Sequence, residues 1–402
     1  MRCLHRLFVL SITVTLAAQT VCGAGFALFE GSARGSALVA LTARADDPSA
    51  IYYNPAGITQ MEGVHMLGGA LFYMPVADVE VETPMGPVTT SSKDTRWAVP
   101  HLYGTWQMND RVWAGLGLYS RFGLGTEFDE DWPGRFNSYS TELQTLTFNP
   151  NIALKLHDKI SVAAGVSAMW FDLTMEQKLP VLEDELNVRF TGDSIGYGYN
   201  AAVRYEALNW LALGASYQSS VKQDLDGTID AGIGKSTASG SIKLPDMLFL
   251  GAVVKPAANL SVEAGAIYSG WSKYDVEKIE IKDPSLLGTP EIVTEKDWND
   301  VWLYYVGSEY GLTDSWDIRL SYAYVPEAGP ERTADYTLLG NDCHTYSVGC
   351  GYRAHSWRLD LAYSYVWIKD RSLNARIEEG VLDSEFKNMR VHVVGVSLTK
   401  EL

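Results

Sequence analysis

The most regular feature of this chain is an alternation of apolar and polar residues with a period of two. The segment SWRLDLAYSYVW (residues 356–367) has polar Arg358, Asp360 and Ser364 between apolar residues at 357, 359, 361, 363, 365 and 367. The segments DSWDIRLSYAYV (314–325) and NLSVEAGAIY (259–268) repeat the pattern. Because successive side chains of a strand point to opposite faces, the alternation predicts β-strands with one apolar face.

About fourteen such segments follow one another along the chain. The connections between them are alternately short, such as NDR, HDK and AHS, and long and polar. Several apolar faces begin or end on Trp or Tyr, as in the aromatic girdles of a lipid-facing band. We therefore predict an all-β transmembrane β-barrel of about 14 antiparallel, up-and-down strands. The expected strands are 63–75, 96–108, 111–121, 143–156, 160–172, 195–207, 210–220, 239–256, 259–271, 298–310, 314–325, 345–353, 356–367 and 386–400.

The charge balance restricts the partners of the protein. The chain has 32 Lys and Arg residues against 49 Asp and Glu residues, which gives a formal net charge of -17. Proteins that bind nucleic acids carry basic patches that neutralise phosphate, so we expect no nucleic-acid partner. We interpret the excess acidic residues as a solvated surface.

Residues 1–24 have the features of a secretory signal peptide. Arg2 and Arg6 form a basic region, LFVLSITVTLAA is the apolar core, and the small residues of VCGA predict cleavage after Ala24. After this segment, no run approaches the ~20 apolar residues of a membrane helix.

Two cysteines remain beyond the signal peptide, Cys343 and Cys350. In an extended strand these positions would be separated by about 20 Å. A disulfide requires Cα atoms within about 7 Å of each other. We expect free thiols unless the segment before Thr345 folds back.

Residues 25–62 do not alternate and contain many small residues. A segment of this size before a barrel either extends into the periplasm or folds into the lumen. A barrel of about fourteen strands is too wide for its own side chains to fill, because about eight strands is the limit. A plug formed by this segment would fill the space.

Two blocks of the sequence resemble the FadL/TodX family of outer-membrane channels for long-chain fatty acids and hydrocarbons. AGFALFEGSARGSALVALTARADDPSAIYYNPAG is similar to the family's N-terminal hatch, with matches at Gly25-Phe26, Asp46-Asp47 and Asn54-Pro55-Ala56. The block from Trp97 to Phe136 is similar to the second and third strands and the loop that follows. The resemblance implies a hatch at residues 25–62 and a barrel at residues 63–402.

The resemblance also implies a function. Hydrophobic molecules would bind in the outer loops, enter an apolar pocket and leave sideways through a kinked third strand, without energy input. The location implied is the outer membrane of a Gram-negative bacterium, with outer-membrane lipid and lipopolysaccharide as neighbours and a monomeric protein.

The resemblance assigns hatch or gating roles to Phe26, Asp46, Asp47, Asn54, Pro55 and Ala56. Pro55 removes a backbone donor, and the side chain of Asn54 can bond its own backbone, so this pair can fix a turn. Taken alone, the pair fits an ordinary turn equally well.

In SRFGLGTEF, Gly123 and Gly125 interrupt a strand, as at a bulge or bend. The same residues would also fit a strand that ends in a flexible loop. The resemblance favours the kink that opens the wall of the barrel.

Two groups of residues are candidates for binding ligand. Arg319 and Arg358 face the lumen and could bind a carboxylate, although Asp317 and Asp360 on the same faces favour structural ion pairs. Four loop aromatics either form an apolar groove for ligand or anchor the loop: Phe122, Phe128, Trp132 and Phe136.

No pattern indicates an enzyme, a metal site or a cofactor. Gly192-Asp193-Ser194-Ile195-Gly196 fits the G-x-S-x-G motif, but it leads into an alternating segment and not into a helix. The histidines are scattered, without metal-ligand spacing. The alternative functions are a structural or adhesive barrel and a general porin for polar solutes. A general porin needs an open lumen, whereas a channel for hydrophobic molecules needs a plugged one. The predicted hatch therefore distinguishes these two classes of function.

Overall fold

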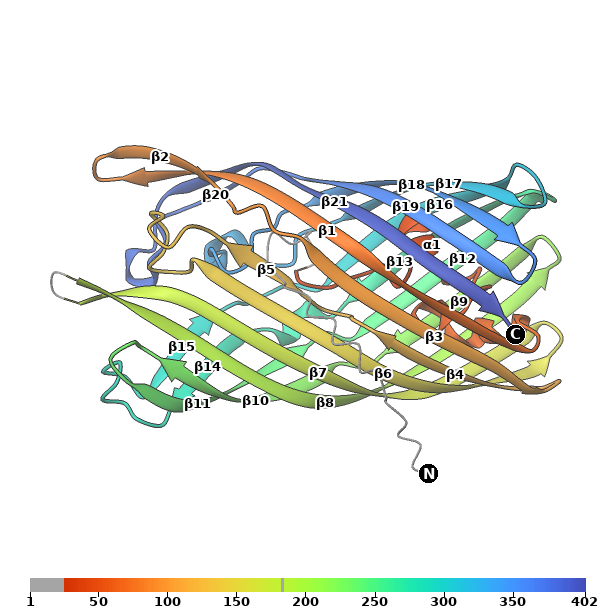
Figure 1. Cartoon of the computed structure of the whole chain (residues 1–402), viewed down its shortest axis with the longest axis horizontal. Helices are drawn as coiled ribbons and strands as arrows, with labels where there is room; N and C mark the ends of the chain where they lie inside the picture. Colours follow the sequence, from red (N-terminus) through yellow and green to blue (C-terminus); the bar gives the residue numbers. More distant parts are fainter. Residues whose placement is uncertain (1–24, 182–183) are drawn as a thin grey trace, which may run out of the picture.

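The computed structural model describes residues 25–181 and 184–402. Within these residues, 14 strands pair in chain order as antiparallel neighbours, and β21 pairs back with β1 to close a barrel (Figure 1). The wall strands are β1 (Val64–Thr83), β3 (Trp97–Asn109), β4 (Val112–Tyr119), β6 (Ser140–His157), β7 (Ile160–Val181), β8 (Asp184–Leu208), β9 (Leu211–Gln218), β12 (Met247–Ala257), β13 (Leu260–Ser269), β16 (Val301–Gly311), β17 (Trp316–Val325), β18 (Cys343–Ala354), β19 (Trp357–Ile368) and β21 (Ser384–Glu401).

The predicted up-and-down barrel is confirmed, and each predicted segment overlaps a wall strand. The prediction of one strand over 239–256 is wrong in its first part. Residues up to Leu244 belong to β11 (Lys235–Leu244), and the wall strand begins only at Met247. Pro245 lies between the two strands, and it has no N–H to donate to a ladder.

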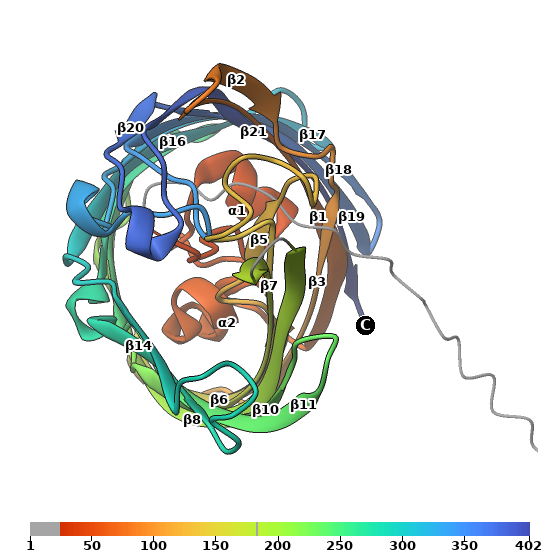
Figure 2. The ribbon, with the colours of Figure 1, turned by 90° about the vertical axis from the view of Figure 1, so that its left-hand side faces the viewer.

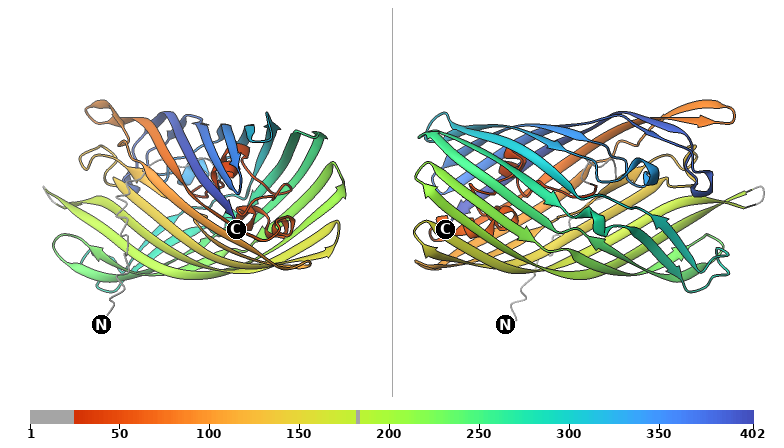
Figure 3. Two further views of the ribbon diagram at one scale, coloured as in Figure 1. Left: turned by 45° about the vertical axis from the view of Figure 1, so that its right-hand side comes forward. Right: turned by 180° about the vertical axis from the view of Figure 1, so that it is seen from behind.

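The end of the barrel that carries the long connections has further strands (Figure 3). Parts of the connections that were predicted to be polar loops are therefore β-strands. In addition, wall strands such as β7 and β8 continue well past their predicted ends. The additional strands are β2 (Gly86–Ser91), β5 (Leu124–Glu127), β10 (Val221–Asp230), β11, β14 (Val276–Ile281), β15 (Glu291–Glu295) and β20 (Arg371–Leu373). Short 3₁₀ turns occur at η2 (Trp271–Lys273), η3 (Glu331–Thr333) and η4 (Ile377–Glu379).

The alternation along the wall strands separates two environments. In β19, Trp357, Leu361 and Tyr363 are exposed on the outer face, whereas Asp360 and Ser364 are buried in the lumen. An apolar outer face with an inward polar face is the arrangement of membrane barrels. None of the helices in the described residues has the length and apolar character needed to cross a membrane.

The N-terminal segment, residues 25–62, lies inside the barrel, where Figure 2 shows its helices within the ring of strands. It contains α1 (Ala33–Leu38), α2 (Ala50–Tyr53) and the 3₁₀ helix η1 (Pro55–Gln60). Helix α1 contacts β1 and the five wall strands β16 to β19 and β21, and η1 contacts β4, β6, β7 and β8. The predicted signal peptide lies outside the described residues.

The two remaining cysteines have different states. Cys350 is free, as expected. Cys343 is disulfide-bonded, but not to Cys350, so the two cysteines beyond the predicted signal peptide are not bonded to each other.

Candidate functional site

The Asn54-Pro55 turn binds the N-terminal segment to the barrel wall. Asn54 is fully buried, and its Oδ1 accepts a hydrogen bond from the N–H of Ala56 at 3.1 Å, which caps η1 with Pro55 as the first residue. Its Nδ2 donates to the carbonyl of Thr42 at 2.8 Å and to the carbonyl of Val203 in β8 at 3.0 Å. One side chain therefore joins two parts of the segment and the wall.

A glycine in the wall makes this contact possible. A Cβ at Gly214 of β9 would lie 2.2 Å from the carbonyl oxygen of Thr42 and 2.8 Å from Nδ2 of Asn54. Any larger residue would push the turn away from the wall.

A cluster of ion pairs also fixes the segment, and we call it the lumenal ion cluster. Arg34 binds Asp46 at 2.7 Å, Asp47 at 3.2 Å and the wall residue Glu309 at 2.9 Å. Arg44 binds Glu309 at 3.1 Å. The cluster consists of Arg34, Arg44, Asp46, Asp47, Glu309, Asp317, Arg319, Arg358 and Asp360.

The two arginines predicted as ligand candidates belong to this cluster. Arg319 binds Glu309 at 2.7 Å and Asp360 at 2.8 Å and also contacts Asp317. Arg358 binds Asp317 at 2.7 Å and Asp360 at 3.1 Å. Both guanidinium groups are paired within the protein, which favours their structural interpretation over ligand binding.

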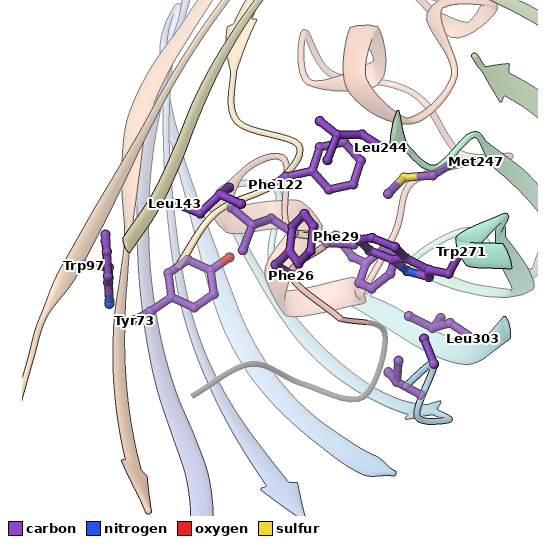
Figure 4. Close-up of a cluster of buried hydrophobic side chains, with 14 of the residues drawn as sticks. Phe26, Phe29, Tyr73, Trp97, Phe122, Leu143, Leu244, Met247, Trp271 and Leu303 are labelled. Carbon is purple, nitrogen blue, oxygen red and sulfur yellow. The ribbon is translucent and has the colours of Figure 1, made fainter. Parts of the chain in front are cut away.

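The first residues of the segment pack in an aromatic cluster (Figure 4). The ring of Phe26 lies 4.7 Å from Trp271, 6.0 Å from Phe122 and 5.9 Å from both Tyr274 and Trp298, measured between ring centroids. Apart from Phe26 and Phe122, these residues were not singled out from the sequence. All three lie in the long connection between β13 and β16, far in the sequence from Phe26 and Phe122, so no local spacing brings them to these residues.

Strand β4 ends at Tyr119, a few residues before the predicted kink at Gly123 and Gly125. It pairs with β3 only as far as Leu118 and with β6 as far as Tyr119, and its chain then turns inward to the N-terminal segment. The N–H of Gly123 donates to the carbonyl of Phe26 at 3.0 Å, and the N–H of Leu28 donates to the carbonyl of Arg121 at 2.8 Å. The chain returns to β6 as β5, where Gly125 pairs with Glu142.

Beyond Tyr119, where the backbone pairing of β4 with β6 ends, side-chain hydrogen bonds connect the chain to β6. Ser120 Oγ donates to the carbonyl of Thr145 at 2.5 Å, and Thr145 Oγ1 accepts from the N–H of Phe122 at 3.2 Å. On the other side, residues 97–101 of β3 have no partner in β4. The wall is therefore interrupted between β3 and β6, and we call this interruption the wall gap.

A cavity of about 210 Å³ lies in the wall gap. It is lined from inside by Leu28, Phe122 and Gly123. From outside it is lined by Pro100, Leu146 and Trp170, which are exposed on the outer face. The cavity thus connects the N-terminal segment with the lipid-facing surface. A Cβ at Gly123 would meet Leu28 at 3.4 Å, so a larger side chain there would enter this space.

The four loop aromatics lie in three different environments. Phe122 lines the wall gap. Phe128 and Trp132 are buried and stack on each other at 4.0 Å, and Trp132 also packs against Tyr336, so they anchor the loop. Phe136 is half-buried beneath the guanidinium of Arg135.

A second cavity, of about 80 Å³, lies among the strands and loops at the long-loop end. Apolar residues such as Phe190 and Ile279 line it together with Lys296 and Asp335, which are paired at 2.8 Å. Burial opposes the charge of Asp335, but Lys296 outweighs it and lowers the pKa of Asp335 below its usual value. Among the described residues, no group of three His, Cys, Asp or Glu side chains is placed to hold a metal ion.

Comparisons with known proteins agree with this architecture. The long-chain fatty acid transport protein of Escherichia coli is 24% identical over 89% of this chain and 90% of that protein. The crystal structure of a Pseudomonas aeruginosa FadL homologue has a TM-score of 0.82 at 20% identity, covering 94% of this chain and 99% of that one. The Pseudomonas putida toluene transporter TodX has a TM-score of 0.70 at 16% identity, covering 88% and 94%. Residues 14–400 match the family described as outer membrane protein transport protein (OMPP1/FadL/TodX), and the chain belongs to this family.

Proposed function

We propose that this protein is an outer-membrane channel for passive uptake of hydrophobic molecules, either long-chain fatty acids or aromatic hydrocarbons. Relatives named as a fatty acid transport protein and as a toluene transporter support both classes. Residues 1–24 would be removed as a signal peptide near Ala24, residues 25–62 would act as the hatch and residues 63–402 as the barrel. The channel would work as a monomer among outer-membrane lipid and lipopolysaccharide.

The cavity in the wall gap is the observation that carries this proposal. A hydrophobic molecule gains about 0.8 kcal/mol for each CH₂ that it keeps out of water. Release of a long chain into the aqueous periplasm would forfeit this free energy, whereas a side opening into the bilayer would retain it. The cavity extends from Leu28 and Phe122 to lipid-facing Leu146 and Trp170, as such an exit requires.

The position of the N-terminal segment favours a channel of this kind over a general porin. Polar solutes would need a continuous aqueous lumen, and the segment occupies the lumen with buried side chains such as Tyr52 and Ile58. A structural or adhesive barrel would not need a cavity through its wall. Family members are transport channels, which supports a role without catalysis.

Filling the wall gap tests the proposal. The double substitution Gly123→Val and Gly125→Val would place side chains at the kink and in β5, so we expect strongly reduced uptake of a labelled fatty acid and a labelled aromatic hydrocarbon into proteoliposomes. Binding of the same molecules to the purified protein should persist.

Gly104→Val is the matched control, because a Cβ at Gly104 of β3 has no atom within 4 Å. It should leave uptake unchanged. Normal uptake by the double variant, with correct assembly shown by heat modifiability, would contradict release through the wall gap.

A further inference from the structure

Glu327 carries a carboxyl group that the protein satisfies only in part. It lies in the long connection between β17 and β18, and its side chain is 14% exposed. Oε1 accepts the N–H of Gly329 at 2.8 Å. Oε2 is buried and has no hydrogen-bond partner among residues 25–181 and 184–402. A buried carboxylate oxygen without a donor favours the neutral form of the acid, because the lost hydration is not replaced.

The neighbouring cation, Arg371 of β20, does not complete the site. Its Nη1 approaches Oε1 of Glu327 only to 3.5 Å. Nη1 and Nη2 instead donate to the carbonyls of Gly340 at 2.5 Å and Gly329 at 2.8 Å. Burial raises the pKa of Glu327 to about 7, and the positive charge of Arg371 offsets this rise only in part.

Asp342, in the same connection, is a carboxylate that the protein satisfies fully. Its Oδ1 accepts the N–H of Glu327 at 3.0 Å. Its Oδ2 accepts the hydroxyl of Tyr324 at 2.9 Å and Nζ of Lys369 at 2.8 Å. Burial opposes the charge of Asp342, but these donors outweigh burial and lower its pKa. The charged neighbours of Glu327 are thus Arg371 and the ionised Asp342, which further disfavours a second carboxylate.

Residues 327–329, which we call the outer clamp, lie against the aromatic cluster. The carbonyl of Ala328 accepts the N–H of Asn299 at 2.8 Å. A Cβ at Gly329 would lie 3.3 Å from Nε1 of Trp298. The ring of Trp298 packs in turn on the first aromatic ring of the N-terminal segment, with 5.9 Å between the centroids. A movement of the outer clamp would therefore uncover one side of the cluster.

We propose that Glu327 makes the outer clamp sensitive to protons, so that the clamp holds Trp298 while Glu327 is neutral and releases it when Glu327 is ionised. The neutral carboxyl group carries no charge that needs hydration, so the closed arrangement is stable. In the ionised form, Oε2 regains its lost hydration only when the clamp opens to water. This regulation goes beyond the proposed channel function and does not depend on which class of molecule is transported.

The raised pKa of Glu327 sets the direction of the pH dependence. In an open, hydrated clamp the carboxyl group has its ordinary pKa of 4.5, whereas in the closed clamp the pKa is about 7, so the closed form binds the proton more tightly. The clamp has its full stability below pH 4.5 and loses stability as the pH rises through about 7. Between pH 5 and pH 8, the ratio of closed to open clamp should fall about 10- to 100-fold.

Hydrogen exchange at the amide of Asn299 measures this opening, because that N–H donates to the clamp at Ala328. Exchange rates of the full-length protein in a non-ionic detergent are measured at pH 5 and pH 8, and each is divided by the intrinsic rate at that pH. We expect the normalised rate of the wild type to rise about 10- to 100-fold. Glu327→Gln keeps the size of the side chain and cannot ionise, so its normalised rate should stay low at both pH values.

Glu331→Gln is the matched control, because it removes the same charge from an exposed position of the same connection. It should keep the pH dependence of the wild type. If Glu327→Gln does not assemble, Glu327→Met, which also cannot ionise, takes its place. Equal normalised rates of the wild type at the two pH values would overturn the inference, and so would an undiminished pH dependence in the Glu327 variant. Either result would leave the channel function intact.

Discussion

The two ends of the N-terminal segment are held in different ways. Residues 26–28 contact the broken strand through aromatic rings and backbone hydrogen bonds to Arg121 and Gly123. Residues 34–54 contact the continuous wall through ion pairs with Glu309 and through the amide of Asn54. Apolar packing is non-directional and tolerates small shifts, whereas paired charges and bidentate contacts fix one geometry. We infer that the first end shapes the wall gap and the second end closes the lumen.

Removing both ends should have the largest effect. Deletion of residues 25–62 would leave a barrel of 14 strands without its lumenal filling, so we expect large, steady ion conductance in planar bilayers. The intact protein should conduct little. A large conductance of the intact protein would show that the segment does not close the lumen.

Phe26→Ala should loosen only the first end. Truncating a buried Phe typically costs about 3–5 kcal/mol, and here the loss falls on the aromatic cluster. Hydrogen exchange should accelerate at residues 25–31, while conductance stays low. Phe72→Ala, at a lipid-facing side chain that is 41% exposed, is the control. Faster exchange throughout the segment would mean that the two ends are one cooperative unit.

Glu309→Gln should loosen only the second end. It removes the charge shared by Arg34, Arg44 and Arg319. Among the described residues, the guanidinium of Arg44 then keeps a hydrogen bond to Ser261 and no ion pair. Breaking a buried pair costs about 3 kcal/mol or more. We expect faster exchange at residues 33–47 and raised conductance.

Asp158→Asn provides the control for Glu309→Gln, because the Asp158 side chain is 94% exposed. Unchanged exchange at residues 33–47 in the Glu309 variant would indicate that the ion cluster does not hold the segment.

Asn54→Ala should have the smallest effect of the series. It removes the cap of η1 and two donated hydrogen bonds, a loss of about 1 kcal/mol for the cap alone. The barrel should assemble normally, and uptake should fall modestly. Asn109→Ala, which removes a turn hydrogen bond at the exposed residue Arg111, should not affect uptake. Normal uptake by Asn54→Ala would indicate that Asn54 and Pro55 form an ordinary turn without a role in transport.

The sequence predicted the wall far better than the contents of the lumen. The period of two is a local property, so each wall strand could be predicted from it. The boundary at Pro245 was wrong because the preceding strand β11 alternates as well, and the pattern therefore continues across the break. The ion cluster joins Arg34 to Glu309 across 275 positions, and no local pattern reports such a pair.

Closing the wall gap with a covalent bridge is the most direct test of the account. In a Cys350→Ser background, Ala98→Cys and Leu146→Cys would place thiols in β3 and β6 on either side of the cavity. The control pair is Val348→Cys and Tyr363→Cys, which are exposed partners across the continuous ladder of β18 and β19. After reaction with a short bismaleimide, uptake of hydrophobic molecules should stop in the gap pair and continue in the control pair. Undiminished uptake in a fully bridged gap pair would show that the molecules leave by another route.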